Sequence, residues 1–300
     1  KKTPISHPEI KLYNSESNSL EVFASLNNPH VTMYTCGPTV YDYAHVGHWF
    51  NYVRMDTLIR TLAFSGLKTK WVMNITDVGH LVSDGDEGED KLQKGANREG
   101  KSAWDIAEFY TEDFLTCMEL LNITKPSFIV KATEHIPEQI ELIKKLEDRE
   151  FTYIIDDGVY YDTSKFPAYG DFAQLDTEEQ QASDRITPNP QKRNPQDFAL
   201  WKLSPKDSKR DMEWESPWGK GFPGWHIECS AMSMMYLGET LDIHTGGIDH
   251  IPVHHTNEIA QSEAITGKRF ANHWMHGNHV MIDNEKISKS AGNGNRLQDV

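Results

Sequence analysis

Hydrophobic and polar positions along the first part of the chain predict a strand, a helix and a second strand. The block VTMYTC (31–36) has the composition of a buried strand. From Gly47 to Ser65 apolar side chains recur at helical spacing, and the pattern ends at Gly66. KTKWVMNIT (68–76) predicts the second strand. This order is typical of a parallel βαβ unit, in which ligand sites lie at the carboxyl ends of the strands.

The middle of the chain is less regular. The polar segment 83–102 predicts an exposed loop, and the segment 104–149 predicts two helices around a strand at 127–133. An Asp-Gly pair within 151–166 predicts a β-hairpin. From 167 to 223 the periodicity is weak, so we expect an insertion in this part of the chain.

The parallel pattern resumes after the insertion. PGWHIECSAMSMMYLG (223–238) predicts a helix, LDIHTGG (241–247) a strand with a glycine turn, and PVHHTNEIAQSEAITG (252–267) another helix, before a hairpin at VMIDNEK. The expected fold class is α/β, with a Rossmann-like parallel sheet split by an inserted connective subdomain. The expected parts are residues 1–121 (first half of the sheet domain), 122–220 (insertion), 221–276 (second half) and 277–300 (final loop region).

Composition favours a cytoplasmic protein with no membrane segment. Hydrophobic residues make up 38% and charged residues 25% of the 300 residues. No apolar run approaches the roughly 18 residues of a membrane span, and the first residues lack a signal-peptide pattern. The formal net charge of -15 argues against a surface coated for nonspecific nucleic-acid binding, so a nucleic-acid partner must be held locally. Three cysteines are too few for a disulfide framework.

Two histidines stand at the predicted start of the first helix. His45 and His48 flank Gly47, whose missing side chain lets a flat ring lie against the backbone. A helix N-terminus collects anions, and imidazoles there can hydrogen-bond phosphate oxygens. The alternative is that both histidines are surface or capping residues.

Two further segments have the composition of nucleotide contacts. HTGGIDH offers Gly246 and Gly247 for close backbone approach and Asp249 for ribose hydroxyls, although a plain turn explains it equally well. KISKS offers Lys286 and Lys289 on a loop that can close over phosphates, and the alternative is a solvated basic loop.

Four residues from three predicted sheet connections have the chemistry of a zinc site. Cys36 ends the first strand, Cys229 lies on a helix, and His254 and Glu258 are four residues apart on one helix face. The alternative is two buried cysteines beside a surface histidine and glutamate. Cys117, inside an apolar helical pattern, is expected in the core.

Taken together, the motifs CGPTVYDYAHVGH, NITD, PGWHIECSAM, HTGGIDH, PVHHTNEIAQSE and KISKS resemble cysteinyl-tRNA synthetases, which are class I aminoacyl-tRNA synthetases. The resemblance runs from about residue 11 to the end of the chain. AHVGH is similar to the HIGH motif of that family, and KISKS to its KMSKS motif with Ile287 in place of methionine.

The resemblance implies roles for individual residues. Cys36, Cys229, His254 and Glu258 match the ligands of one Zn²⁺ that binds the thiolate of the substrate. The amino-acid pocket is expected to include Gly37, Thr76, Trp225 and His244. ATP contacts are expected from His45, Gly47, His48, Gly246, Gly247, Asp249 and Lys289, and His45, His48, Lys286 and Lys289 are the expected catalytic residues.

The implied activity is ATP-dependent activation of L-cysteine, followed by transfer to the acceptor end of tRNA(Cys). Mg²⁺ is expected with ATP, and a monomer is expected. Zinc distinguishes a thiol from the harder alcohol of serine, so no editing domain is expected. Family members continue well past the KMSKS loop into an anticodon-recognising region, whereas this sequence extends ten residues beyond KISKS.

Three alternatives stay open at this point. A mycothiol-type cysteine ligase shares the zinc, HIGH and KMSKS features but uses an amino-sugar acceptor, and CGPTVYD with HHTNEIAQSE favours the tRNA enzyme. A catalytically silent zinc- or cysteine-binding module is the second alternative, and the histidine pair and loop lysines argue against it. A purely structural zinc protein is the third.

Overall fold

A computed structural model gives the fold of the chain. It describes residues 9–79, 90–174, 189–205, 210–282, 285–287 and 294–299. Within these residues, no helix is both long enough and apolar enough to cross a membrane.

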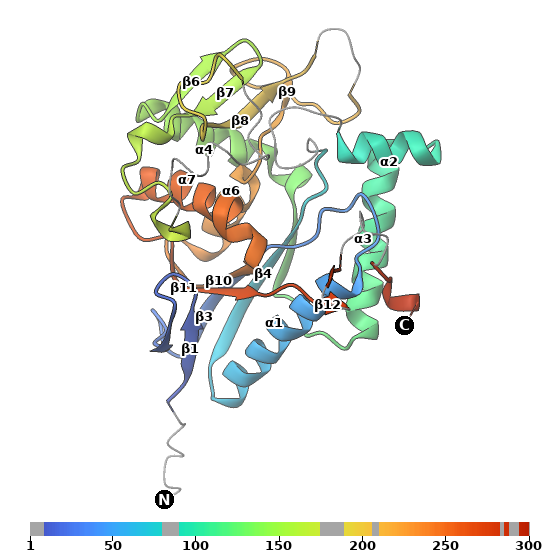
Figure 1. Cartoon of the computed structure of the whole chain (residues 1–300), viewed down its shortest axis with the longest axis vertical. Coiled ribbons are helices and arrows are strands. Elements are labelled where there is room, and N and C mark those ends of the chain that lie inside the picture. Colours follow the sequence, from blue (N-terminus) through green and yellow to red (C-terminus); the bar gives the residue numbers. More distant parts are fainter. Residues whose placement is uncertain are drawn as a thin grey trace, which may run out of the picture.

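A five-stranded parallel sheet forms the centre of the molecule (Figure 1). Its strands lie side by side in the order β11 (Ala271–Gly277), β10 (Leu241–Gly247), β3 (His30–Thr35), β4 (Lys68–Ile75) and β5 (Phe128–Lys131). All four neighbouring pairs are parallel. Strands from both ends of the sequence meet at β10 and β3, which confirms the expected α/β class with a sheet assembled from two halves.

Helices cover both faces of the sheet because the strands are apolar on both faces. On β3, Val31 and Met33 pack in one hydrophobic core with α1 and α3, whereas Tyr34 packs in a second core with the helices of the opposite face. Successive side chains of a strand point to opposite faces, so both cores use the same strands. The helices are α1 (Val46–Phe64) and α3 (Ala103–Leu120) on one face, and α4 (Ile136–Asp148), α6 (Ile227–Leu237) and α7 (Thr256–Thr266) on the other.

The segment expected as an exposed loop at 83–102 contains a helix, and for these residues the expectation is wrong. Helix α2 (Lys91–Glu99) begins after Asp90, whose carboxylate accepts hydrogen bonds from the backbone N–H groups of Leu92 and Gln93. It ends at Gly100 in the left-handed conformation. Leu92 and Ala96 are fully buried. Residues 80–89 lie outside the described part of the chain.

A second, antiparallel sheet stands above the first (Figure 1). Its strands are β6 (Thr152–Ile155), β7 (Gly158–Tyr161), β8 (Phe198–Leu203) and β9 (Gly221–Pro223). The pairing of β6 with β7 confirms the predicted hairpin. Strand β5 belongs to the central sheet, so the sheet extends beyond residue 122, where the insertion was expected to begin.

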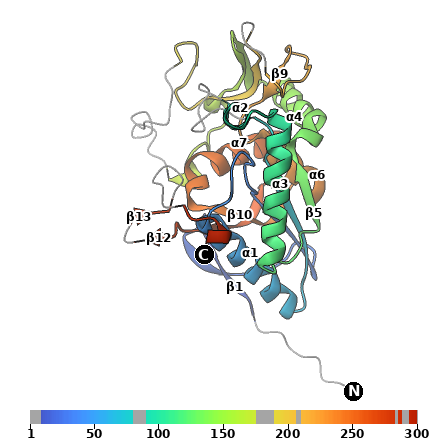
Figure 2. The ribbon, with the colours of Figure 1, turned by 90° about the vertical axis from the view of Figure 1, so that its right-hand side faces the viewer.

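Two short hairpins complete the described fold. Near the start, β1 (Lys11–Asn14) pairs with β2 (Ser19–Val22). Near the end, β12 (Met281–Ile282) pairs with β13 (Glu285–Lys286), where a hairpin was predicted. Figure 2 shows this second hairpin beside α1 and the C-terminal turn η7 (Leu297–Asp299).

Candidate active site

A cavity of about 630 Å³ opens at the carboxyl edge of the central sheet. The ends of β3, β4 and β10 meet there, as expected for a parallel sheet with crossover connections. Most of the residues singled out in the sequence line this one cavity: Cys36, Gly37, His45, Gly47, His48, Thr76, Trp225, Cys229, Gly247, Asp249 and His254.

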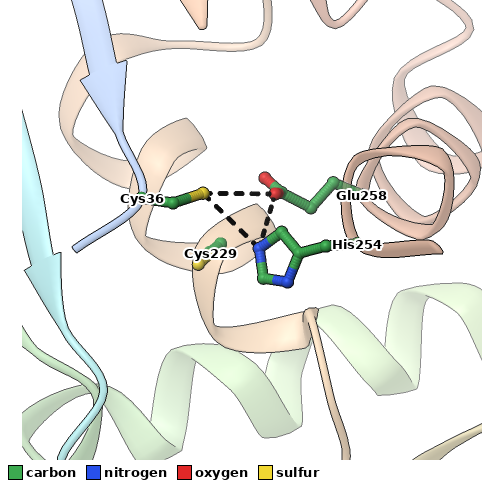
Figure 3. A group of neighbouring side chains, drawn as sticks. All are labelled: Cys36, Cys229, His254 and Glu258. Carbon is green, nitrogen blue, oxygen red and sulfur yellow. Dashed lines mark hydrogen bonds and ion pairs between the residues drawn. The ribbon is translucent and has the colours of Figure 1, made fainter. Parts of the chain in front are cut away.

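Four possible metal ligands lie close together (Figure 3), and three of them line the cavity. One donor atom from each of Cys36, Cys229, His254 and Glu258 lies within 4.8 Å of the others. The Nε2 atom of His254 is 2.9 Å from Glu258 Oε1 and 3.5 Å from Cys36 Sγ. Cys36 Sγ is 3.8 Å from the same Glu258 oxygen.

The fold explains why residues so far apart in sequence converge. Cys36 directly follows β3, and Cys229 lies in the first turn of α6. His254 belongs to a π-helical turn (Ile251–His255) that leads into α7, and Glu258 lies one turn further on. π-Helical turns often occur at functional sites. Here the turn and the helix place His254 and Glu258 on the side that faces both thiols.

Neighbouring histidines fix the orientation of two of these ligands. His226 Nδ1 is 2.8 Å from His254 Nδ1, so the Nε2 atom of His254 faces the cluster. His244 Nε2 is 2.8 Å from Glu258 Oε2. Burial opposes the charge of Glu258, but His244 and His254 more than offset it and lower its pKa to about 2. The Glu258 side chain is therefore a carboxylate that two imidazoles hold in place.

The two thiols differ in acidity without a metal. Burial, followed by the contact with Cys229, raises the pKa of Cys36 well above its ordinary value. A hydrogen bond from Cys36 lowers the pKa of Cys229. Thiolates bind metals, so metal binding at this cluster must release protons.

The donor set fits zinc, which binds thiolates, imidazoles and carboxylates. A second combination, Cys36, His244, His255 and Glu258, also lies within 4.8 Å. It shares two residues with the first, but only its Cys36 lines the cavity, whereas three members of the first set do. An ion held by Cys36, Cys229, His254 and Glu258 would face the cavity, so this set is the one suited to binding a substrate atom.

The floor of the cavity lies between β3 and β4. The backbone N–H of Gly37 donates to Asn74 Oδ1 at 2.8 Å, and a Cβ at Gly37 would lie only 1.6 Å from the Asn74 carbonyl oxygen. Thr76 accepts a hydrogen bond from Asn74 Nδ2 at 3.0 Å. His244 was expected in the amino-acid pocket; the structure places it beneath the cluster, fully buried and stacked on Trp274.

The two histidines of the AHVGH motif lie where α1 begins. His45 is the N-cap residue, and its backbone N–H donates to His48 Nδ1 at 3.1 Å. The rings stack at 3.7 Å between centroids. A Cβ at Gly47 would lie 2.9 Å from the His45 ring, so glycine allows the ring to lie against the helix. The helix N-terminus and both rings face the cavity, an arrangement suited to anions.

The glycine turn after β10 divides into two parts. Gly247 and Asp249 line the cavity, and Asp249 is exposed. Gly246 is buried behind them, where a Cβ would lie 2.6 Å from His250 and 2.8 Å from His255.

The KISKS loop is described in part. Its buried Ile287 lines the cavity close to Gly47. The side chain of Lys286 and the whole of Lys289 lie outside the described structure.

Sequence reasoning did not single out several residues that build this site. His226 contacts His254, and His255 Nδ1 is 2.7 Å from His276 Nε2, so a histidine group surrounds the metal ligands. Asn74 contributes to the polar floor, and Glu228 lies in the adjoining cavity wall, where it accepts a hydrogen bond from Thr76. The sequence did hold one signal for them, because His226 and Glu228 shortly precede Cys229 and His255 directly follows His254.

Solved structures share the fold of this chain. A Mycobacterium tuberculosis methionyl-tRNA synthetase in complex with methionyl-adenylate matches with a TM-score of 0.61 and 15% identity, over 88% of this chain and 60% of that chain. A second methionyl-tRNA synthetase structure from this organism gives a TM-score of 0.62 at 14% identity, over 89% and 60% of the two chains. The fold is that of a class I tRNA synthetase catalytic domain.

The family follows from sequence. The family model of the tRNA synthetases class I (C) catalytic domain matches residues 22–300, and the chain belongs to this family. A "Cysteine--tRNA ligase" of Treponema denticola is 53% identical over 291 residues, which are 97% of this chain and 59% of the relative. "Cysteine--tRNA ligase 1" of Burkholderia lata is 52% identical over 96% of this chain and 62% of the relative. The resemblance drawn from the motifs is thereby confirmed.

Proposed function

We propose that the chain is the catalytic part of a cysteine--tRNA ligase, which activates L-cysteine with ATP and transfers it to the 3' end of tRNA(Cys). One observation carries the proposal. The Cys36, Cys229 and His254 side chains open onto the same cavity as His45 and His48 at the start of α1. A thiol-binding site and an anion-binding site thus share one space.

In the first step, a carboxylate oxygen of cysteine attacks the α-phosphorus of ATP while the bond to pyrophosphate breaks. The products are cysteinyl adenylate and pyrophosphate. No residue needs to act as a nucleophile, because positioning and charge stabilisation carry this step. We assign phosphate contacts to His45 and His48, the ribose to Asp249, and closure over the phosphates to Lys286 and Lys289. Mg²⁺ would accompany ATP.

Zinc at Cys36, Cys229, His254 and Glu258 would hold the substrate thiol as a thiolate. Shape alone distinguishes cysteine from serine poorly, since a difference of this size is worth only about 1–3 kcal/mol in a pocket. Coordination adds a preference for sulfur over an alcohol oxygen. Neighbouring side chains orient two of these ligands: His226 orients His254, and His244 orients Glu258.

The remaining proposals concern the tRNA, the oligomeric state and the location of the protein. We propose that the acceptor end of tRNA(Cys) reaches this cavity, that the protein acts as a monomer in the cytoplasm, and that it does not bind membranes. The net charge of -15 requires a local tRNA contact rather than a generally basic surface.

Exchange of labelled pyrophosphate into ATP tests the proposal. Zinc-loaded protein should catalyse exchange with cysteine and not with serine. Cys229→Ser should abolish the exchange, whereas Cys117→Ser should retain it, because Cys117 is buried in α3 outside the cavity lining. Exchange that is equal with both amino acids, or absent from folded, zinc-loaded protein, would contradict the proposal.

A further inference from the structure

Glu228 is a carboxylate in the cavity wall to which no role has been assigned. Its residue is only 1% exposed, yet it lines the cavity and directly precedes Cys229. The other acidic residues in the described lining are Asp42 and Asp249, and both are more accessible to solvent. Of these three acidic residues, Glu228 is the deeply buried one, and it is the sequence neighbour of the candidate metal ligand Cys229.

A chain of polar contacts links Glu228 to Gly37, the residue that follows Cys36. The Gly37 N–H donates to Asn74 Oδ1, and Asn74 Nδ2 donates to Thr76 Oγ1. The Thr76 hydroxyl then directs its own proton toward Glu228 Oε1, 3.5 Å away. Gly37 follows Cys36 and Glu228 precedes Cys229, so this chain of contacts joins the neighbours of the two thiols and orients one carboxylate oxygen of Glu228.

The chemistry of the substrate supplies the group that such a carboxylate would bind. Only three bonds separate the sulfur of cysteine from its amino nitrogen. With the thiol at the Cys36, Cys229 and His254 cluster, the α-ammonium group must lie close to the same wall. The substrate carboxylate must instead point toward the start of α1, where the α-phosphorus is expected. A carboxylate that lines a cavity is a suitable partner for an ammonium group, because hydrogen bonds between two charged groups are strong.

We propose that Glu228 binds the α-ammonium group of the substrate, with Thr76 orienting its carboxylate. The inference rests on the proposed function, because it places the thiol at the metal cluster. Cysteine is then held at two points before ATP reacts. The competing explanation is structural: Glu228 lies in the first turn of α6, where an acidic side chain stabilises the helix dipole. A purely structural glutamate would not distinguish ligands by their amino group.

Titration calorimetry with three thiols separates these explanations. L-Cysteine carries both the ammonium and the carboxylate, cysteamine lacks the carboxylate, and 3-mercaptopropionate lacks the ammonium. Each is titrated into the zinc-loaded chain, into Glu228→Gln and into Glu263→Gln. The last is a matched control, because Glu263 is partly buried on α7 and accepts a hydrogen bond from the backbone N–H of Phe270, outside the cavity lining.

The proposal predicts that the unmodified chain binds cysteine and cysteamine about 10- to 100-fold more tightly than 3-mercaptopropionate. Glu228→Gln should reduce this advantage to within about threefold, and Glu263→Gln should keep it. The role of Glu228 would be overturned if Glu228→Gln kept the tighter binding of cysteine and cysteamine, or if the unmodified chain did not show it. Thiol binding in either case would still support the proposed function. If no thiol binds the zinc-loaded chain, the proposed function itself fails. Should Glu228→Gln not fold, Thr76→Val replaces it: loss of the hydroxyl that orients the Glu228 carboxylate should reduce the same advantage, and an unchanged advantage would overturn the proposal.

Discussion

The Nδ1 atom of His226 lies 2.8 Å from the Nδ1 atom of His254. His226 reaches this position from the N-cap of α6, with φ at 74°, in the left-handed region that few non-glycine residues adopt. Such backbone conformations often occur at functional sites. The contact fixes the His254 ring, so that its other nitrogen faces Cys36 and Glu258.

We expect His226→Ala to weaken zinc binding by about 10- to 100-fold, because the ligand loses the partner that orients it. Competition with a chromogenic chelator measures the change. His273→Ala is the control, since His273 is buried beside Phe23 and belongs to neither candidate donor set. Equal zinc affinities in the two variants would show that His226 does not orient the ligand.

Zinc removal should lower thermal stability as well as abolish exchange. A ligand present at 1,000 times its dissociation constant stabilises the folded state by about 4 kcal/mol. Chelation should therefore lower the melting temperature of the unmodified chain and of Cys117→Ser. Cys229→Ser should melt at the same temperature with and without zinc. A zinc-dependent melting shift in Cys229→Ser as large as in the unmodified chain would argue for the set that includes His244 and His255.

Gly47→Ala should weaken ATP binding selectively. The added Cβ would lie 2.9 Å from the His45 ring, which must then move away from the start of α1. We expect a loss of about tenfold in ATP affinity, equivalent to one lost hydrogen bond to a charged group, with cysteine binding unchanged. Titration of each ligand separately measures both. A parallel loss of cysteine affinity would mean that the substitution disturbs the cavity as a whole.

Gly37→Ala and Gly95→Ala should have opposite effects on the free energy of unfolding. At Gly37 the new Cβ meets the Asn74 carbonyl oxygen at 1.6 Å, so the backbone must shift, at a cost of about 1–3 kcal/mol. At Gly95, within α2, the nearest atoms lie at 3.4 Å, and alanine should stabilise the helix by about 0.5–1 kcal/mol. Urea unfolding of both variants checks the prediction. A neutral Gly37→Ala would contradict the tight β3–β4 floor.

The main sheet could be predicted because its strands are short, mostly apolar runs, such as VTMYT and WVMNI, separated by segments long enough for crossover helices. Helix α2 was missed because its composition is mostly polar, although Leu92 and Ala96 lie four residues apart on one helix face and are buried. Asp90 was the available signal, because a capping aspartate before Leu92 is a recognised helix start. The boundary at 122 missed β5, because nothing local in its sequence tells a central strand from an inserted one.

The metal ligands were predictable because their side chains have a strong preference for binding metal ions. Two cysteines with a histidine and a glutamate suggested a metal, and the structure brings these four together. The contacts of the supporting residues were not predictable, although His226 and Glu228 lie close to Cys229 in the sequence. His226 contacts His254 in the turn before α7, and Glu228 contacts Thr76 just after β4, so these contacts form only when the elements meet. His244 was expected to line the amino-acid pocket but contacts Glu258 from beneath.

X-ray absorption at the zinc edge shows most directly whether the substrate thiol binds the metal. In the unmodified chain with one zinc bound, we expect two sulfur neighbours at about 2.3 Å, from Cys36 and Cys229, together with nitrogen or oxygen neighbours. Addition of L-cysteine should raise the sulfur count to three, and addition of L-serine should not. A sulfur count that stays the same when cysteine binds would contradict the account, because the substrate thiol would then be held away from the metal.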